Sequence, residues 1–120
     1  MLVVDDARWQ RLNLAKILKA AGHEVIEAAD GAEALTRLAT DRPEAVVCDL
    51  QMPNLDGFGF LAEAQTRDVH VPIVVASADI QESSRLRCKQ LGAVAFVAKP
   101  FQAADILEAL AEAIHVRRAV

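Results

Sequence analysis

Acidic, hydroxyl and basic side chains stand at the ends of four apolar segments of this 120-residue chain. The segment LVVDD ends in the pair Asp5 and Asp6, and AVVCD ends in Asp49. PIVVAS ends in Ser77, and AFVAK ends in Lys99. Alone, each residue has an ordinary interpretation as a helix cap, a turn residue or a surface lysine. Together, four segments that end in this way predict a common site.

The residue types indicate phosphoryl chemistry at such a site. Three neighbouring carboxylates would repel one another and raise one another's pKa values. A hard divalent cation removes this conflict, and Mg²⁺, or Mn²⁺ in its place, binds carboxylates together with phosphate oxygens. A lysine and a hydroxyl group can hold further phosphate oxygens. The set predicts a site where a carboxylate attacks phosphorus and forms an acyl phosphate.

Short strand-like and helical segments alternate along the chain and must position these residues. Five strands are predicted, at Leu2–Asp5, Glu24–Ala28, Ala45–Asp49, Pro72–Ser77 and Ala95–Lys99. Residues at helical spacing, nearly all of them apolar, predict helices between and after the strands: Leu14, Ile17, Leu18 and Ala21; Leu35, Leu38 and Ala39; Ile80, Ser84, Cys88 and Leu91; Leu107, Leu110, Ala111 and Ile114. Asp30 and Gly31 mark the start of the second helix.

The alternation predicts one architecture. Three strands are almost wholly apolar, which is typical of strands covered on both faces. Right-handed crossovers then lead to a doubly wound, flavodoxin-like α/β sandwich with a five-stranded parallel sheet. Residues 1–120, 53% of them hydrophobic, are expected to form a single domain. Ligands of such sheets bind beyond the carboxyl ends of the strands, where the polar residues stand.

Composition excludes several function classes. A net charge of −4 argues against a direct nucleic-acid interface, which normally carries a basic excess. No apolar run approaches the roughly 20 residues that cross a membrane. Cys48 and Cys88 lack metal-ligand spacing, so we expect reduced thiols in a cytoplasmic protein.

The blocks LVVDD, VVCDLQMPNLDG, VVASA and GAVAFVAKPF resemble, in order and spacing, the signature blocks of the response-regulator receiver domain of two-component signalling. The resemblance covers essentially all 120 residues. It implies that Asp49 is the phosphoacceptor and that Asp6 binds Mg²⁺ directly. It further implies that Asp5 acts on the metal largely through a bound water and that the backbone carbonyl of Gln51 completes the metal sphere.

The same resemblance implies how the site would communicate with a partner. Lys99 would bind the phosphoryl group and precede a cis peptide bond to Pro100. Ser77 would be the switch hydroxyl and Phe96 the switch aromatic, with the small Ala78 beside the phosphoryl site. A sensor histidine kinase or a histidine phosphotransfer protein would donate the phosphoryl group. The face of the fourth helix, fifth strand and fifth helix would then bind a downstream protein or a second copy, so that the chain acts as a switch and not as a turnover enzyme.

Three other functions fit these residues less well. A phosphatase of the haloacid dehalogenase type also uses a strand-end aspartate and Mg²⁺, but it needs a second acid where Gln51 stands and a cap domain. A flavodoxin-like FMN carrier would need a phosphate loop in place of DDARWQR. A degenerate receiver that acts only as a scaffold would lack some of the key residues.

Overall fold

Five parallel strands form a single sheet in the computed structural model, which describes residues 1–119 and the side chains of residues 1–115. The strands are β1 (Leu2–Val4), β2 (Ile26–Ala28), β3 (Val46–Cys48), β4 (Ile73–Ser77) and β5 (Ala95–Ala98). Their order is β2-β1-β3-β4-β5, the order of flavodoxin-like sheets. The predicted sheet is confirmed, although each of the five strands is one or two residues shorter than expected.

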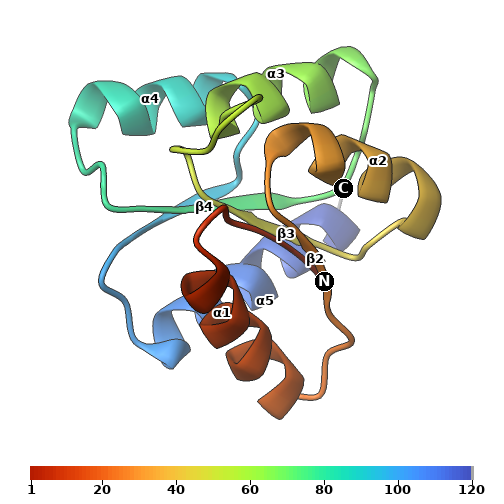
Figure 1. Ribbon diagram of the computed structural model, residues 1–120, viewed down its shortest axis with the longest axis vertical. Coiled ribbons are helices and arrows are strands. Elements are labelled where there is room, and N and C mark those ends of the chain that lie inside the picture. Colours follow the sequence, from red (N-terminus) through yellow and green to blue (C-terminus); the bar gives the residue numbers. More distant parts are fainter. Residues whose placement is uncertain (120) are drawn as a thin grey trace.

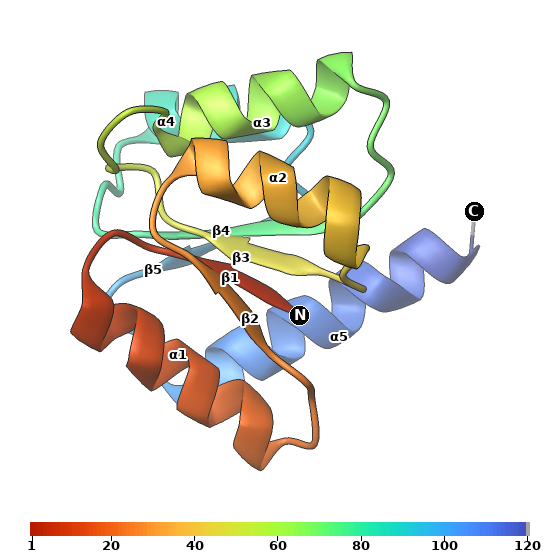
Figure 2. The ribbon, with the colours of Figure 1, turned by 45° about the vertical axis from the view of Figure 1, so that its right-hand side comes forward.

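Five helices cover the two faces of the sheet. They are α1 (Arg8–Ala20), α2 (Gly31–Asp41), α3 (Gly57–Thr66), α4 (Glu82–Gln90) and α5 (Ala103–Ala119). Helices α1 and α5 lie on one face of the sheet, and α2, α3 and α4 lie on the other (Figure 1 and Figure 2). No helix in the described part of the chain combines the length and the apolar character needed to cross a bilayer.

The alternation of side chains along each strand divides the core into two layers. Leu2 and Val4 point to the layer beneath α2, α3 and α4, where Phe60 is fully buried. Val3 points to the opposite layer, with Leu18 of α1 and Ile106 of α5. Because both layers are apolar, the polar residues at the strand ends are left at the edge of the sheet.

The residues that the helices bury were predicted only in part. Ala21, Ala39 and Ala111 are exposed, whereas the nearby Ala15, Ala34 and Ala113 are buried. Ala21 is the C-cap of α1 and lies past the face that the helix buries. Ile80 is also exposed, because it lies in the loop that precedes the start of α4 at Glu82.

Candidate functional site

Asp5 and Asp6 follow β1 directly and differ in their surroundings. Asp5 is only 1% exposed, and its Oδ1 accepts a hydrogen bond from the Ala7 backbone N–H at 2.9 Å. Asp6 is exposed. The buried carboxylate is thus held in place by the turn that leads into α1, while its neighbour faces solvent.

Asp49 stands at the end of β3, next to β1 in the sheet. The register pairs Cys48 with Val4, so the residues that follow these two strands emerge side by side. The Oδ1 atom of Asp49 accepts a hydrogen bond from the Leu50 backbone N–H at 2.7 Å. One carboxylate oxygen from each of Asp5, Asp6 and Asp49 lies within 4.8 Å of the others. The structure therefore brings the three predicted acids together.

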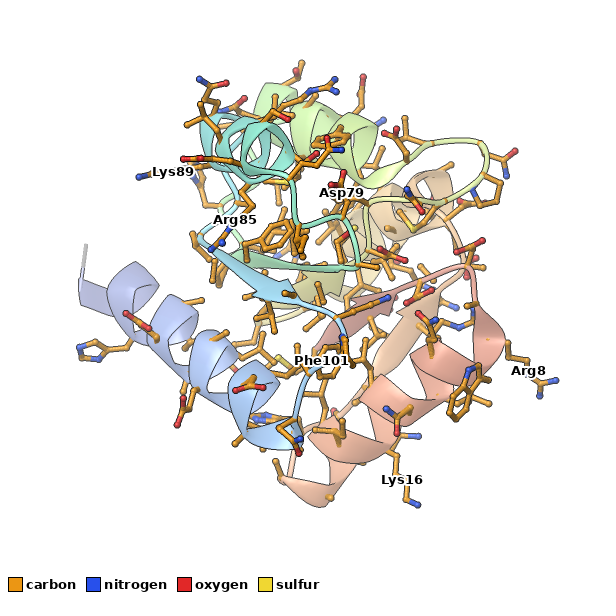
Figure 3. All side chains as sticks on the ribbon, turned by 90° about the vertical axis from the view of Figure 1, so that its left-hand side faces the viewer. Arg8, Lys16, Asp79, Arg85, Lys89 and Phe101 are labelled. Carbon is orange, nitrogen blue, oxygen red and sulfur yellow. The ribbon has the colours of Figure 1, made fainter. Side chains whose placement is uncertain are left out.

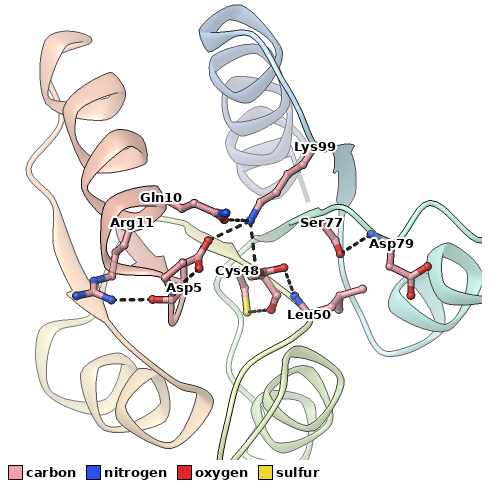
Figure 4. Close-up of polar contacts among 10 residues, drawn as sticks. Asp5, Gln10, Arg11, Cys48, Leu50, Ser77, Asp79 and Lys99 are labelled. Atoms are coloured by element: carbon pink, nitrogen blue, oxygen red, sulfur yellow. Dashed lines mark hydrogen bonds and ion pairs between the residues drawn. The ribbon is translucent and has the colours of Figure 1, made fainter.

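Lys99 reaches this acidic cluster from β5. Its Nζ atom donates to Asp5 Oδ2 at 3.0 Å and to Asp49 Oδ2 at 3.3 Å, and also to Gln10 Oε1 at 2.7 Å (Figure 4). The Lys99 side chain is 16% exposed. The Lys99–Pro100 peptide bond is cis, as the resemblance implies.

The pKa of Asp49 is raised in the folded protein. Burial raises the pKa of Asp49, and the nearby Asp5 carboxylate adds to this rise. The Lys99 ammonium and the Leu50 N–H lower the pKa of Asp49 but do not cancel the rise. A site that holds three acids, one of them of raised pKa, and one ammonium group fits a divalent cation.

The family model for the response regulator receiver domain matches residues 1–111. The chain belongs to the response regulator receiver domain family. It is 39% identical over 111 residues to the chemotaxis protein CheY of Bacillus subtilis, a match that covers 92% of each protein. It is 36% identical over 116 residues to the sensory/regulatory protein RpfC of Xanthomonas campestris, but it spans only 16% of the length of RpfC.

A solved receiver structure agrees with this membership. The receiver domain of NtrX from Brucella abortus is 30% identical and superposes with a TM-score of 0.89, over 95% of this chain and 97% of the other. The response regulator receiver domain is a module of two-component signalling, and domains of this family generally bind Mg²⁺ at an acidic pocket. The family match therefore favours the signalling switch over the phosphatase alternative.

In this receiver domain, Ser77 lies at the end of β4 and is turned toward the loop that follows. Ser77 is 1% exposed, and its Oγ atom accepts a hydrogen bond from the Asp79 N–H at 3.1 Å (Figure 4). The Asp79 carboxylate in turn accepts from the Ser84 hydroxyl at 2.6 Å, which ties the loop to α4. The Ser77 hydroxyl is thus connected to α4 through Asp79 and Ser84.

Phe96 lies in β5 and is half-buried. The guanidinium carbon of Arg85, from α4, lies 5.2 Å from the centre of the Phe96 ring. Figure 3 shows Arg85 beside the β4–β5 side of the sheet, with Asp79 in the preceding loop. Arg85 and Phe96 line a hollow of about 660 Å³ between α4 and β5, together with Ile80 and Leu86. Gln51 lies in the loop after β3 with its side chain exposed.

Two residues of α1 touch the site and were not predicted from the sequence. Gln10 accepts a hydrogen bond from Lys99, as described above. Arg11 donates from Nη1 to the Asp5 backbone carbonyl at 2.8 Å and from Nε to Glu27 Oε1 at 2.9 Å. A signal was available, because Gln10 lies four residues after Asp6 and therefore within the first turn of α1.

Proposed function

We propose that Asp49 accepts a phosphoryl group from a sensor histidine kinase or a histidine phosphotransfer protein, and that the chain is a phosphorylation-dependent switch. The observation that carries this proposal is the meeting of Asp5, Asp6 and Asp49 within 4.8 Å, with the Lys99 ammonium in contact with two of them. This arrangement supports a carboxylate nucleophile, a cation site and a phosphate-binding ammonium at one point.

The donor set fits Mg²⁺. Carboxylate oxygens of Asp6 and Asp49 would hold the ion, Asp5 would act on it largely through a bound water, and the backbone carbonyl of Gln51 would complete its protein ligands. When bound, Mg²⁺ would neutralise charge on the carboxylates and on the phosphoryl oxygens. The fit rests on the short separation of three acids that otherwise repel one another.

The chain's own residues then have distinct roles in the transfer. A carboxylate oxygen of Asp49 attacks phosphorus, and a P–O bond forms while the P–N bond of the donor phosphohistidine breaks. The electron pair of the broken bond returns to the imidazole nitrogen. Lys99 donates hydrogen bonds to the equatorial phosphoryl oxygens, where negative charge is concentrated.

Ser77 would report the new charge to the partner surface. Its oxygen already accepts from Asp79, which leaves the hydroxyl hydrogen free to donate to a phosphoryl oxygen. Movement of Ser77 opens space into which Phe96 turns, and the face formed by α4, β5 and α5 changes its affinity for a partner. A hydrogen bond to a charged group contributes about 1.5–3 kcal/mol, which shifts a two-state population by roughly one to two orders of magnitude.

The proposed partners follow from this switch. A downstream protein or a second copy of the chain would bind the α4–β5–α5 face. The chain would catalyse its own phosphorylation and dephosphorylation without being a turnover enzyme. Cys48 and Cys88 are buried free thiols, in keeping with a reducing compartment, and we propose the cytoplasm. Residues 1–120 are proposed to act as one receiver domain.

Replacement of Ser77 separates chemistry from switching. We expect Ser77→Ala to accept a phosphoryl group from acetyl phosphate but to lose most of the response of α4, β5 and α5, because the hydrogen bond that reports the charge is gone. Asp49→Asn should lose both. Backbone amide shifts near Leu86 and Phe96, recorded with and without beryllofluoride in Mg²⁺, measure the response. A full wild-type shift pattern in Ser77→Ala would show that the coupling runs through other residues.

A further inference from the structure

The ammonium group of Lys99 has three hydrogen atoms and three acceptors. The acceptors are Gln10 Oε1 at 2.7 Å, Asp5 Oδ2 at 3.0 Å and Asp49 Oδ2 at 3.3 Å (Figure 4). The donor capacity of Lys99 is therefore fully used before any phosphoryl group arrives. A phosphoryl oxygen can be bound only if at least one of these hydrogen bonds is exchanged.

The three acceptors are not equivalent. Asp5 and Asp49 belong to the acidic cluster and would turn their oxygens to Mg²⁺ and, in the case of Asp49, to phosphorus. Gln10 has no charge, is exposed and lies outside this cluster. It is therefore the acceptor that remains available to Lys99 when the carboxylates are engaged elsewhere.

We infer that Gln10 is a positioning residue that holds the Lys99 ammonium over the site once Mg²⁺ and a phosphoryl group have taken the carboxylate oxygens. The inference rests on the proposed function and extends it to α1. A lysine side chain has four rotatable bonds, and fixing it by one acceptor in advance lowers the entropy lost when it binds the phosphoryl oxygens.

The helix that carries Gln10, α1, is held firmly against the sheet. Arg11, the next residue, joins α1 to the Asp5 carbonyl and to Glu27 of β2. Leu14 and Leu18 bury the same helix against the sheet. The reach of Gln10 is therefore set by a fixed helix. Gln10 and Lys99 also border a hollow of about 350 Å³. This hollow leaves room for the Lys99 side chain to adopt other conformations when its ammonium group is not held by Gln10.

The test compares binding of Mg²⁺ alone with binding of beryllofluoride, a phosphoryl mimic, at saturating Mg²⁺. Calorimetric titration would be applied to the wild type, Gln10→Met and Asn13→Met. Methionine keeps the length of the side chain and removes the oxygen acceptor. Asn13 borders the same hollow one turn further along α1 and is the matched control.

We expect Gln10→Met to weaken beryllofluoride binding by about three- to tenfold, the range of one net hydrogen bond, and to leave Mg²⁺ affinity within about twofold. Asn13→Met should match the wild type in both titrations. A purely structural effect on α1 would instead change Mg²⁺ binding as well. The same substitution in a Lys99→Met background should change beryllofluoride affinity by less than about twofold, because the ammonium is absent.

Two results would overturn the inference while leaving the proposed function intact: wild-type beryllofluoride affinity in Gln10→Met, or an undiminished effect of Gln10→Met in the Lys99→Met background. Failure of the proposed function would look different. In that case the wild type itself would not bind beryllofluoride in Mg²⁺ and would not gain a phosphoryl group on Asp49.

Discussion

Asp49 carries its charge at a cost to the folded state. Burial is the largest cause of its raised pKa, and Asp5 adds to it, so folding favours the protonated carboxyl group. The folded protein then binds more protons than the unfolded chain between the two pKa values. The stability that this group contributes is present below the unfolded pKa and is lost as pH rises through the folded pKa.

A neutral side chain at this position should therefore stabilise the metal-free protein. In buffer with a chelator at pH 7, we expect Asp49→Asn to melt at a higher temperature than the wild type. The difference should shrink as the pH falls toward about 4, where free carboxyl groups protonate. Thermal unfolding followed by circular dichroism across this range measures the effect. An Asp49→Asn variant that is less stable at pH 7 would contradict it.

The acidic cluster should also make stability depend on Mg²⁺. An ion that binds only the folded state stabilises it by about 2.7 kcal/mol at one hundred times its dissociation constant. We expect the melting temperature to rise with Mg²⁺, and to rise less in Asp6→Asn, which removes one ligand of the cluster. Fluorescence of Trp9, three residues past Asp6, offers a second readout. A wild-type melting temperature that does not respond to Mg²⁺ would contradict the metal site.

At the residue scale, the sequence predicted the groups that follow strands and missed those on a helix. Asp5, Asp49 and Lys99 were predictable because parallel strands bring their carboxyl ends to one edge. Gln10 and Arg11 were missed because their contacts depend on how far a long side chain reaches from α1, which no periodicity specifies. The roles in phosphoryl chemistry stay predictions.

At the scale of elements, the start of α3 fixes the position of the loop that carries Asp49. Gly57 is the first residue of α3, and its N–H donates to the Leu50 carbonyl at 2.9 Å. A Cβ atom at Gly57 would lie 2.3 Å from the Asp49 carbonyl oxygen and 2.7 Å from the Leu50 Cα atom. Both neighbours are backbone atoms, so the chain can admit a side chain at Gly57 only by moving the loop that carries Asp49.

We therefore expect Gly57→Ala to lower the free energy of unfolding by about 1–3 kcal/mol, as overpacking does. Gly59→Ala, in the same helix, is the control. A Cβ atom there meets the flexible end of Leu55, and alanine is the better helix former by about 0.5–1 kcal/mol. Urea unfolding compares the two variants. Equal stability of Gly57→Ala and Gly59→Ala would contradict the close approach of α3 to Asp49.

The sequence predicted the positions of the helices and strands more accurately than it predicted which residues they bury. Asp30 was predicted to open α2, and its side chain accepts from the Glu33 N–H at 2.8 Å as the N-cap. Ala21 and Ala39 were expected on the buried faces of their helices and are exposed. Because alanine is small, it occurs on the solvent face of a helix as readily as on the buried face, so its position does not identify the buried face.

At the scale of the whole molecule, the topology could be predicted because few arrangements join five strands by right-handed helical crossovers. The same topology places the acidic cluster on one side of β4 and pairs β5 with the other side. Phe96 of β5 lines the hollow against α4. Ser77 lies between the two regions and is hydrogen-bonded toward α4 through Asp79 and Ser84. The sheet thus links the acidic cluster to the proposed partner surface.

The most direct test of the account is the chemical nature of the phosphorylated product. The protein would be incubated with acetyl phosphate and Mg²⁺ and weighed by mass spectrometry before and after treatment with hydroxylamine, which cleaves acyl phosphates. We predict one added phosphoryl group that hydroxylamine removes and that Asp49→Ala does not acquire. An adduct that resists hydroxylamine, or that persists in Asp49→Ala, would contradict the assignment of Asp49 as the phosphoacceptor.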